Sequence, residues 1–188
     1  MLKSAKFLVL VSLALLAFSI TLGTLSGTPG HDPIHIRIDY HNVTQDMKRQ
    51  QILFKEIDCL ARNVYYEARG ESEQGQLAVA QVTLNRVESG MFPDSICGVV
   101  NERYMVKGQE VCQFSWRCDP NANKNLLVSE SNPIFQLAWL AIRDYHKLSV
   151  VTHDTYWFHA DYVRPTWRKF KERVAQIDDH IFYRQKQP

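Results

Sequence analysis

An apolar stripe with helical spacing runs through the middle of the chain. From Lys55 onward, apolar residues recur three and four positions apart, which places them on one face of an α-helix. The stripe consists of Ile57, Leu60, Val64 and Ala68. Gly70 follows it, and glycine often ends helices because it tolerates the backbone angles of a C-terminal cap. The pattern predicts a helix from Lys55 to Ala68.

A second apolar stripe predicts a helix from Ser72 to Glu88. The hydroxyl of Ser72 can cap the first turn, and Glu73 places a negative charge near the positive end of the helix. Gly90 is suited to end it. The residues expected to face the core are Leu77, Ala80, Leu84 and Val87. Only residues 69–71 separate the two helices, so the turn between them is predicted to be tight.

The C-terminal half mixes helical and extended patterns. Residues 90–131 show no clear periodicity, and a third helix is predicted from Asn132-Pro133, since asparagine caps helices and proline fits the first helical position. Its core face would comprise Ile134, Leu137, Ala138, Ala141, Ile142 and Tyr145. Residues 150–158 are rich in β-branched and aromatic types and predict a strand, as do residues 180–183. The predicted class is α+β, mostly helical with a small sheet.

The N-terminus has the pattern of an export signal. Lys3 and Lys6 precede an apolar run over residues 7–22, which is short for a membrane span and suits either a cleaved signal peptide or a retained anchor. Residues 23–50 lack helical periodicity and predict a linker with scattered surface histidines. The expected division is a leader at 1–27, a linker at 28–50 and a folded domain at 51–188.

Composition and charge narrow the class of protein further. The 188 residues are 45% hydrophobic and 22% charged, which suits one globular domain behind a leader. The formal net charge is +2, and removing Lys3 and Lys6 leaves equal numbers of basic and acidic residues. Non-specific nucleic-acid binding requires clustered cations, so the charge argues against a nucleic-acid partner.

The four cysteines are even in number, which favours disulfides in an exported chain. Three pairings are possible, and we favour Cys112–Cys118, which closes a short loop, together with Cys59–Cys97. Free buried thiols remain the alternative, and a reactive thiol beside a histidine would instead indicate a peptidase. There is no C-x-x-C and no H-E-x-x-H, so neither a metal nor another cofactor is expected.

Glu67 is the main candidate for chemistry. It lies near the end of the first predicted helix, beside the apolar stripe and two tyrosines. Apolar surroundings raise the pKa of a carboxyl group, and a carboxylic acid that stays protonated near neutral pH can protonate a glycosidic oxygen. The alternative is a solvated glutamate or one paired with Arg62 or Arg69.

Several separated segments of the chain resemble the spore-cortex-lytic enzyme family of cell-wall hydrolases. The first is LARNVYYEARGE at residues 60–71, and CQFSW at residues 112–116 is another. Further matching segments are residues 75–76, 78–80, 84–87, 92–93, 97–100, 159–163 and 165–167. Residues 152–159 depart from the family pattern, which often has a glycine-alanine step there, so the wall of the cleft is expected to differ.

The resemblance implies a lysozyme- or transglycosylase-like fold, α+β and mostly helical with a small antiparallel sheet. It implies cleavage of the β-1,4 bond between N-acetylmuramic acid and N-acetylglucosamine, with Glu67 as the catalytic residue of the 51–188 domain. Members of this family are usually described as lytic transglycosylases, in which one carboxyl group acts first as acid and then as base. Hydrolysis would need a second carboxylate, for which Glu71 and Asp161 are the candidates.

Ten further side chains are predicted to contact the glycan. The alternatives are packing in the core for the aromatic ones, capping of the helix end for Asn85, and a structural role for His159. They are Tyr66, Glu71, Asn85, Gln113, Phe114, Ser115, Trp116, His159, Tyr162 and Trp167. A basic run is predicted to form a solvated helix face that could also attract the anionic wall. It comprises Arg164, Arg168, Lys169, Lys171 and Arg173.

The expected partners follow from this reading. They are peptidoglycan strands and, for the N-terminal segment, the export machinery or a membrane, with a monomer as the expected state. The protein is expected in the periplasm or cell envelope, with residues 7–22 as an inner-membrane anchor if they are retained. A non-catalytic peptidoglycan-binding module is the alternative function.

Overall fold

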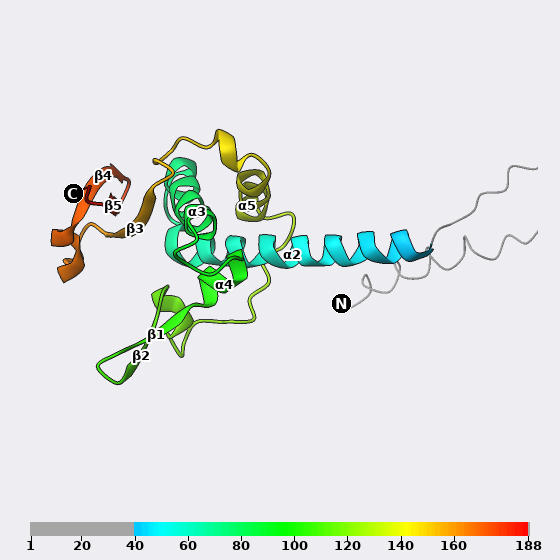
Figure 1. The fold of residues 1–188 in the computed structure, drawn as a ribbon, viewed down its shortest axis with the longest axis horizontal. Helices are drawn as coiled ribbons and strands as arrows, with labels where there is room; N and C mark the ends of the chain where they lie inside the picture. The colour runs from blue at the N-terminus through cyan, green and yellow to red at the C-terminus, as the bar shows by residue number, and fades with distance from the viewer. Residues whose placement is uncertain (1–39, 188) are drawn as a thin grey trace, which may run out of the picture. The chain divides into compact units, whose positions relative to one another are not determined.

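The computed structural model describes residues 40–187, and the helix α2 (Tyr40–Ala68) runs through the centre of this unit (Figure 1). Its C-terminal half is packed on several sides by the helices α3 (Glu73–Glu88), α4 (Ile96–Asn101) and α5 (Pro133–Arg143). Leu60, Ala61 and Val64 of α2 are fully buried there. The predicted apolar stripe is therefore the core face of this helix.

The N-terminal half of α2 corrects one prediction. The helix begins at Tyr40 rather than near Lys55, so residues 40–50, expected to lack helical structure, are helical and extend beyond the other helices (Figure 1). Residues 44–55 are exposed, so this part has no buried face to create an apolar period. It contains neither glycine nor proline, and it prolongs a helix that is already held by packing.

The helices α3 and α5 begin where their capping residues predict. Ser72 accepts a hydrogen bond from the Gly75 N–H at 3.2 Å, and Asn132 accepts one from the Ile134 N–H at 2.9 Å. Helix α3 is buried on most of its surface, including polar residues such as Asn85 and Arg86. A central helix of this kind places polar side chains inside the protein, where each needs a partner.

Two small antiparallel sheets complete the fold. The strands β1 (Arg103–Val106) and β2 (Gln109–Cys112) form a hairpin, and a second sheet has the order β3-β5-β4. The bounds of the second sheet are Thr155–Ala160 for β3, Lys171–Ile177 for β4 and His180–Gln185 for β5. Three 3-10 helices connect these elements, namely η1 (Ser115–Arg117), η2 (Tyr145–Lys147) and η3 (Thr166–Phe170). The predicted α+β class is confirmed.

Two extended regions differ from their predictions. The strand predicted over 150–158 begins at Thr155 and continues to Ala160, because residues 150–154 form a loop. The basic run after residue 163 is not a solvated helix face, because it contains η3 and then the strand β4. Pairing of β4 with β5 satisfies its backbone, and the spacing of charged residues carries no information about that pairing.

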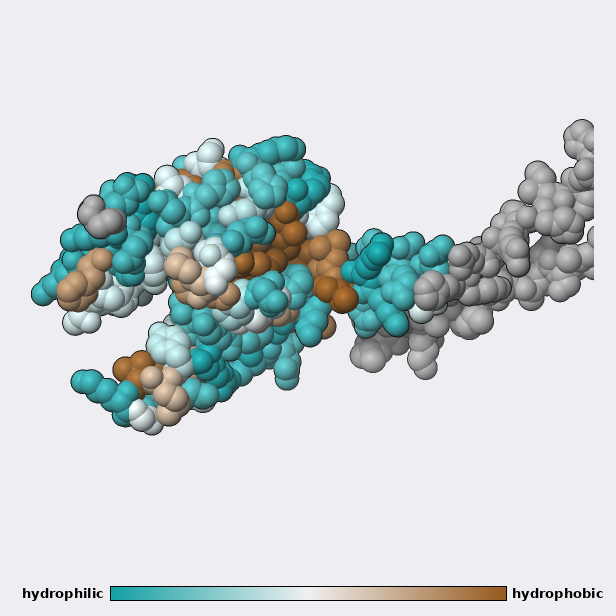
Figure 2. Space-filling model, viewed as in Figure 1, coloured by the Kyte–Doolittle hydropathy of each residue, from teal (hydrophilic) through white to brown (hydrophobic). Residues whose placement is uncertain are grey.

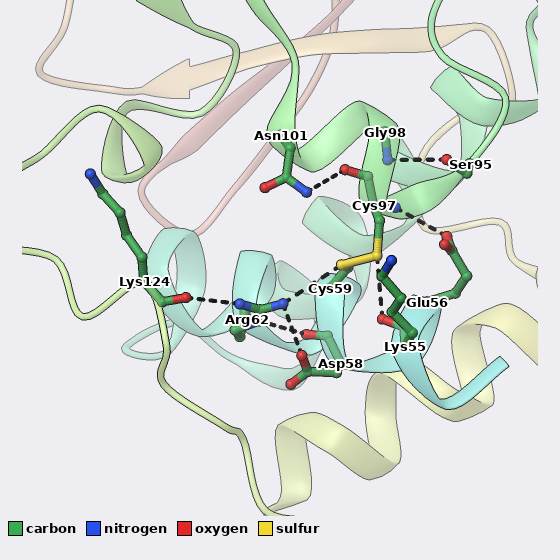
Figure 3. Close-up of a disulfide and its surroundings, with 10 residues drawn as sticks. All are labelled: Lys55, Glu56, Asp58, Cys59, Arg62, Ser95, Cys97, Gly98, Asn101 and Lys124. Carbon is green, nitrogen blue, oxygen red and sulfur yellow. Dashed lines mark hydrogen bonds and ion pairs between the residues drawn. A yellow bond between two sulfur atoms is a disulfide. The ribbon is translucent and has the colours of Figure 1, made fainter. Parts of the chain in front are cut away.

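Both predicted disulfides are present. Cys59–Cys97 joins α2 to α4 with a Cα–Cα distance of 5.2 Å, and Cys112–Cys118 closes a short loop with a distance of 5.7 Å. Figure 3 shows that the first bond lies beside an ion pair between Arg62 and Asp58, whose atoms are 2.9 Å apart. Disulfides persist in oxidising compartments, so these bonds indicate a location outside the cytoplasm.

The predicted leader lies outside the described residues. Residues 1–27 and most of the predicted linker are therefore predictions that the structure does not address. In the range 40–187, none of the helices combines the length and the apolar character needed to cross a membrane. The same range contains no group of three or more His, Cys, Asp or Glu placed to hold a metal ion.

Candidate active site

A cavity of about 600 Å³ lies where the end of α2 meets the β1–β2 hairpin, the loop around η1 and the strand β3. Figure 2 shows the surface hollowed between the hairpin and the three-stranded sheet. Most of the side chains predicted to contact a glycan line this cavity. They are Tyr66, Gln113, Phe114, Ser115, Trp116, His159, Tyr162 and Trp167.

Glu67 also lines the cavity, one residue before the end of α2. Its carboxyl lies deep in the protein but is reached from the cavity, and burial raises its pKa to about 7, although the positive charge of Arg86 lowers it. Within residues 40–187 this carboxyl makes neither a hydrogen bond nor an ion pair. It is therefore free to interact with a bound molecule.

The side chains around Glu67 are held by a small polar and aromatic network. The Trp116 indole N–H donates to Asn63 Oδ1 at 3.0 Å, and the Asn63 amide donates to Thr83 at 3.2 Å. The Tyr66 ring stacks on Trp116 with centroids 4.5 Å apart, and its hydroxyl donates to the Asn123 carbonyl at 2.8 Å. These contacts fix the loop of the Cys112–Cys118 disulfide against α2.

Arg86 is a lining residue that the sequence analysis did not single out. Its guanidinium lies between the rings of Phe92 and Phe114, 5.3 and 5.1 Å from their centroids. Its Nε donates to the Tyr156 carbonyl at 2.8 Å, and both terminal nitrogens donate to the Gln113 side-chain oxygen at 2.9 and 3.0 Å. Burial lowers the Arg86 pKa to about 10, with nearby acidic groups opposing the change, so the group stays charged at neutral pH.

An irregularity in β3 makes the Tyr156 carbonyl available to Arg86. The register of β3 against β5 shifts between Thr155 and Trp157, so Tyr156 has no partner residue in β5. Bulges of this kind are common beside active sites, because they redirect groups away from the sheet ladder. Here the free carbonyl binds the guanidinium of Arg86.

The sheet supplies a second wall of the cavity. His159 is buried and its Nε2 lies 3.0 Å from the Tyr183 hydroxyl, while Trp167 lies edge-on to the imidazole at 5.6 Å. Tyr162 stands at the mouth of the cavity with 81% of its surface exposed. His159 is thus fixed in place, whereas Tyr162 is open to an incoming chain.

Two predicted contacts, Glu71 and Asn85, do not line the cavity. Asn85 donates to the carbonyls of Thr152 and Thr155 at 3.0 and 2.9 Å and accepts from the Tyr145 hydroxyl at 2.9 Å. A buried amide used in this way holds the loop before β3 in place.

Glu71 likewise makes contacts within the protein. Its Oε2 accepts a hydrogen bond from the Asp179 N–H at 3.2 Å, and its Oε1 lies 3.9 Å from His180 Nδ1. Asp161, the other candidate for a second carboxylate, is absent from the cavity wall. Among the residues that the structure describes, Glu67 is therefore the only carboxylate in that wall.

A family model described as Cell Wall Hydrolase matches residues 70–183 of the chain. The chain belongs to the Cell Wall Hydrolase family. This confirms the predicted family. The matched range begins just after Glu67, so the family match does not itself include the candidate acid.

Curated relatives of this cell-wall hydrolase carry the name spore cortex-lytic enzyme. The one from Oceanobacillus iheyensis is 32% identical over 127 residues, which cover 68% of this chain and 41% of the relative. The one from Bacillus subtilis is 53% identical over 47 residues, which cover 25% and 15%. The chain thus spans well under half of the length of these relatives.

Two solved structures are similar to this cell-wall hydrolase. They are the catalytic domains of SleB from Bacillus cereus and from Bacillus anthracis, and the latter is described as a germination-specific lytic transglycosylase. Each is 27% identical, has a TM-score of 0.51 and covers 69% of this chain. The match covers 89% and 93% of the two domains, respectively.

Several lining residues of the cavity were not predicted from the sequence. They are Arg86, Tyr104, Phe158, Lys171 and His180. Arg86 lies among polar residues of α3 such as Asn85 and Glu88, so the sequence gives no sign that it is buried. The sequence gives no such sign for Lys171 either, because it lies within a run of basic residues.

Proposed function

We propose that this chain cleaves the β-1,4 bond between N-acetylmuramic acid and N-acetylglucosamine as a lytic transglycosylase, with Glu67 as acid and then base. The observation that carries the proposal is the position of Glu67, whose carboxyl has a raised pKa of about 7 and opens into a cavity of about 600 Å³. A pKa near the working pH suits a group that must give up a proton and take one back.

The proposed reaction has two steps. Protonated Glu67 donates its proton to the glycosidic oxygen as the bond from that oxygen to C1 of the muramic sugar breaks. The Glu67 carboxylate then accepts the proton of the O6 hydroxyl of the same sugar while O6 forms a bond to C1. The products are a 1,6-anhydro end and a new free hydroxyl, and the acid returns to its starting state.

The absence of another carboxylate from the described cavity wall supports this route. A retaining hydrolase places a carboxylate nucleophile about 5 Å from its acid, and an inverting one places a base at about 6.5–9.5 Å. Neither Glu71 nor Asp161 lines the cavity. The attack by the sugar's own O6 requires no such second group.

Arg86 supports the second half of the cycle. Its charge lowers the pKa of Glu67, which means that it favours the carboxylate form. The carboxylate exists between the two steps, while the muramic C1 carries positive character. We infer that Arg86 stabilises this state through its charge, and that Phe92, Phe114 and Gln113 hold it in place.

The test is digestion of purified sacculi, with mass spectrometry of the soluble products. Wild type should release muropeptides that end in an anhydro sugar, each lighter by one water than the hydrolytic product. Glu67→Gln should lower the rate by roughly 10²–10⁴-fold, because it removes the general acid. Glu73→Gln is a matched control, since Glu73 is exposed on the first turn of α3.

Three results would contradict the proposal. Products with reducing ends would show that the chain is a hydrolase and not a transglycosylase. Full activity of Glu67→Gln would show that Glu67 is not the general acid. Binding to sacculi with no soluble product from wild type would indicate a non-catalytic wall-binding module.

We also propose that the chain acts in the cell envelope after export, with residues 7–22 as signal or anchor. The two disulfides and the membership of a cell-wall hydrolase family support a location outside the cytoplasm.

A further inference from the structure

The wall of the cavity that the sheet forms carries a cation, Lys171, at the start of β4. Its Nζ lies 3.4 Å from the centroid of the Trp157 ring and donates a hydrogen bond to Gln185 Oε1 at 2.5 Å. An ammonium group has three N–H donors, so the glutamine and the ring face leave one without a partner. No carboxylate of the described residues forms an ion pair with Lys171.

The charges of the residues that line the cavity are unbalanced, although Glu102, which does not line it, interacts with Arg86. Glu67 is the single carboxylate among the described lining residues, and burial favours its neutral form, while Arg86 and Lys171 both carry positive charge. Three of the five N–H groups of the Arg86 guanidinium donate to protein oxygens, and Arg86 is buried with 3% of its surface exposed. Lys171 is half-buried and is thus the more accessible of the two cations in this wall.

This local excess of positive charge does not follow from the overall composition. Apart from the two lysines of the predicted leader, the chain has equal numbers of basic and acidic residues. A cationic wall in a recessed site raises the local concentration of anions, because water there screens charge less well than in bulk. Burial also lowers the pKa of Lys171, so the ammonium gains by acquiring a negative partner.

We propose that Lys171 binds a carboxylate of the glycan substrate and that the site therefore prefers acidic strands over neutral ones. The inference rests on the proposed function, since it concerns the same cavity. Two parts of peptidoglycan can supply this group. The lactyl ether of muramic acid ends in a carboxylate where no peptide is attached, and a stem peptide carries carboxylates of its own.

The contact with Trp157 fixes the direction of the ammonium group. One side of the cation faces the indole, and Gln185, the register partner of Lys171 on β5, holds a second side. Interactions with an aromatic face and with a neutral amide are weaker than a charge-assisted hydrogen bond to a carboxylate. Because one N–H of the ammonium has no partner, a carboxylate that enters the cavity can bind Lys171 without displacing either neighbour.

The test measures binding in the Glu67→Gln background, where the ligand is not consumed. Three ligands are titrated by calorimetry: glycan strands with stem peptides, strands stripped of peptides by an amidase, and chitotetraose, which lacks the lactyl group. Lys171→Met should weaken binding of acidic strands about tenfold and leave chitotetraose unchanged. Lys171→Arg, which keeps the charge, should restore most of the affinity.

The choice of acidic strand distinguishes the two sources. If Lys171→Met loses affinity only for stripped strands, Lys171 binds the lactyl carboxylate. If it loses affinity only for peptide-bearing strands, Lys171 binds a carboxylate of the stem peptide. A loss of affinity for both means that either carboxylate can bind. Lys169→Met is the matched control, because Lys169 is exposed and absent from the cavity wall. It should bind all three ligands like the parent.

Two outcomes would overturn the inference. One is unchanged affinity of Lys171→Met for both acidic strands. The other is an equal loss on chitotetraose, which would mean that Lys171 only supports Trp157. Neither result depends on catalysis, so a wild type that releases no muropeptides would refute the proposed function separately.

Discussion

At the scale of single residues, Glu67 is subject to two opposed effects. Burial disfavours its carboxylate and raises the pKa to about 7, while the charge of Arg86 favours the carboxylate. Burial is the larger effect, so the group is close to half protonated at neutral pH. The raised pKa of Glu67 therefore predicts how the stability and the activity of the protein depend on pH.

Glu67→Gln should stabilise the folded protein at pH 8 and leave its stability unchanged at pH 4. At pH 4 the carboxyl is protonated in both states. As pH rises from about 4.5 to about 7 the unfolded chain ionises while the folded one does not, so wild type loses up to about 3 kcal/mol. Urea unfolding at both pH values measures this. Equal stability of the two proteins at pH 8 would contradict the burial of Glu67.

Arg86→Met should move the pH dependence of activity upward. In wild type, kcat/KM should fall by about tenfold per pH unit above pH 7, as Glu67 loses its proton. Without the Arg86 charge the Glu67 pKa rises, so the fall should begin at higher pH, and the maximal rate should drop. Initial rates of muropeptide release between pH 5 and 9 measure both effects.

Two further variants control the Arg86 prediction. Arg86→Lys keeps a charge and should retain a profile near that of wild type. Arg49→Met removes an arginine whose side chain is 80% exposed on the N-terminal half of α2 and should change nothing. A downward shift of the profile in Arg86→Met would contradict the assigned electrostatic role.

At the scale of elements, the turn after Glu67 is joined to the turn between β4 and β5. The N–H and the hydroxyl of Ser72 both donate to Asp178 Oδ2, at 3.0 and 2.6 Å. Glu71 accepts from the Asp179 N–H on the same turn. This joint sets the position of the sheet wall relative to the candidate acid.

Gly75→Ala should disturb this joint. A Cβ at Gly75 would lie 2.4 Å from Asp178 Oδ2 and 3.0 Å from Glu71 Cβ, so one of them must move. We expect a loss of about 1–3 kcal/mol in the free energy of unfolding, typical of overpacking, together with reduced activity. Gly70→Ala is the matched control, because a Cβ there meets no atom within 4 Å. Equal unfolding midpoints for both variants would contradict the joint.

The elements differ in how far the sequence could predict them. The starts of helices α3 and α5 can be predicted from local signals, namely the capping residues Ser72 and Asn132. The exposed half of α2 and the strand β4 lack such signals. The helix propensity of its residues prolongs α2 beyond its packed part, and pairing with β5 determines β4. The site role of Glu67 could be predicted because the residues that indicate it are its neighbours in one continuous segment. Lys171 reaches the cavity only because β4 pairs with β5, which the local sequence does not reveal.

At the scale of the whole molecule, the buried core of the described unit does not extend to residues 44–55 of α2. The buried hydrophobic residues begin at Ile57, and residues 44–55 are exposed. The packing that builds the cavity is therefore contained in the part of the chain that follows residue 50. This agrees with a catalytic domain at 51–188, which remains a prediction.

A protein of residues 51–188 should fold and cleave sacculi like one of residues 40–188. Residues 44–50 of the removed segment are exposed, so we expect the two Tm values to agree within about 3 °C. Calorimetric melting and digestion of sacculi measure this. A large fall in Tm or activity would show that the start of α2 belongs to the folded domain.

The short Cys112–Cys118 bridge has a consequence for when the protein becomes competent. It encloses residues 113–117, among which Gln113 and Phe114 hold Arg86 and Trp116 packs on Tyr66. In a reducing interior this ring would be open and its contacts less constrained. If the chain acts as proposed, the oxidised protein should cleave sacculi faster than the reduced one, because only the closed ring holds these side chains in place.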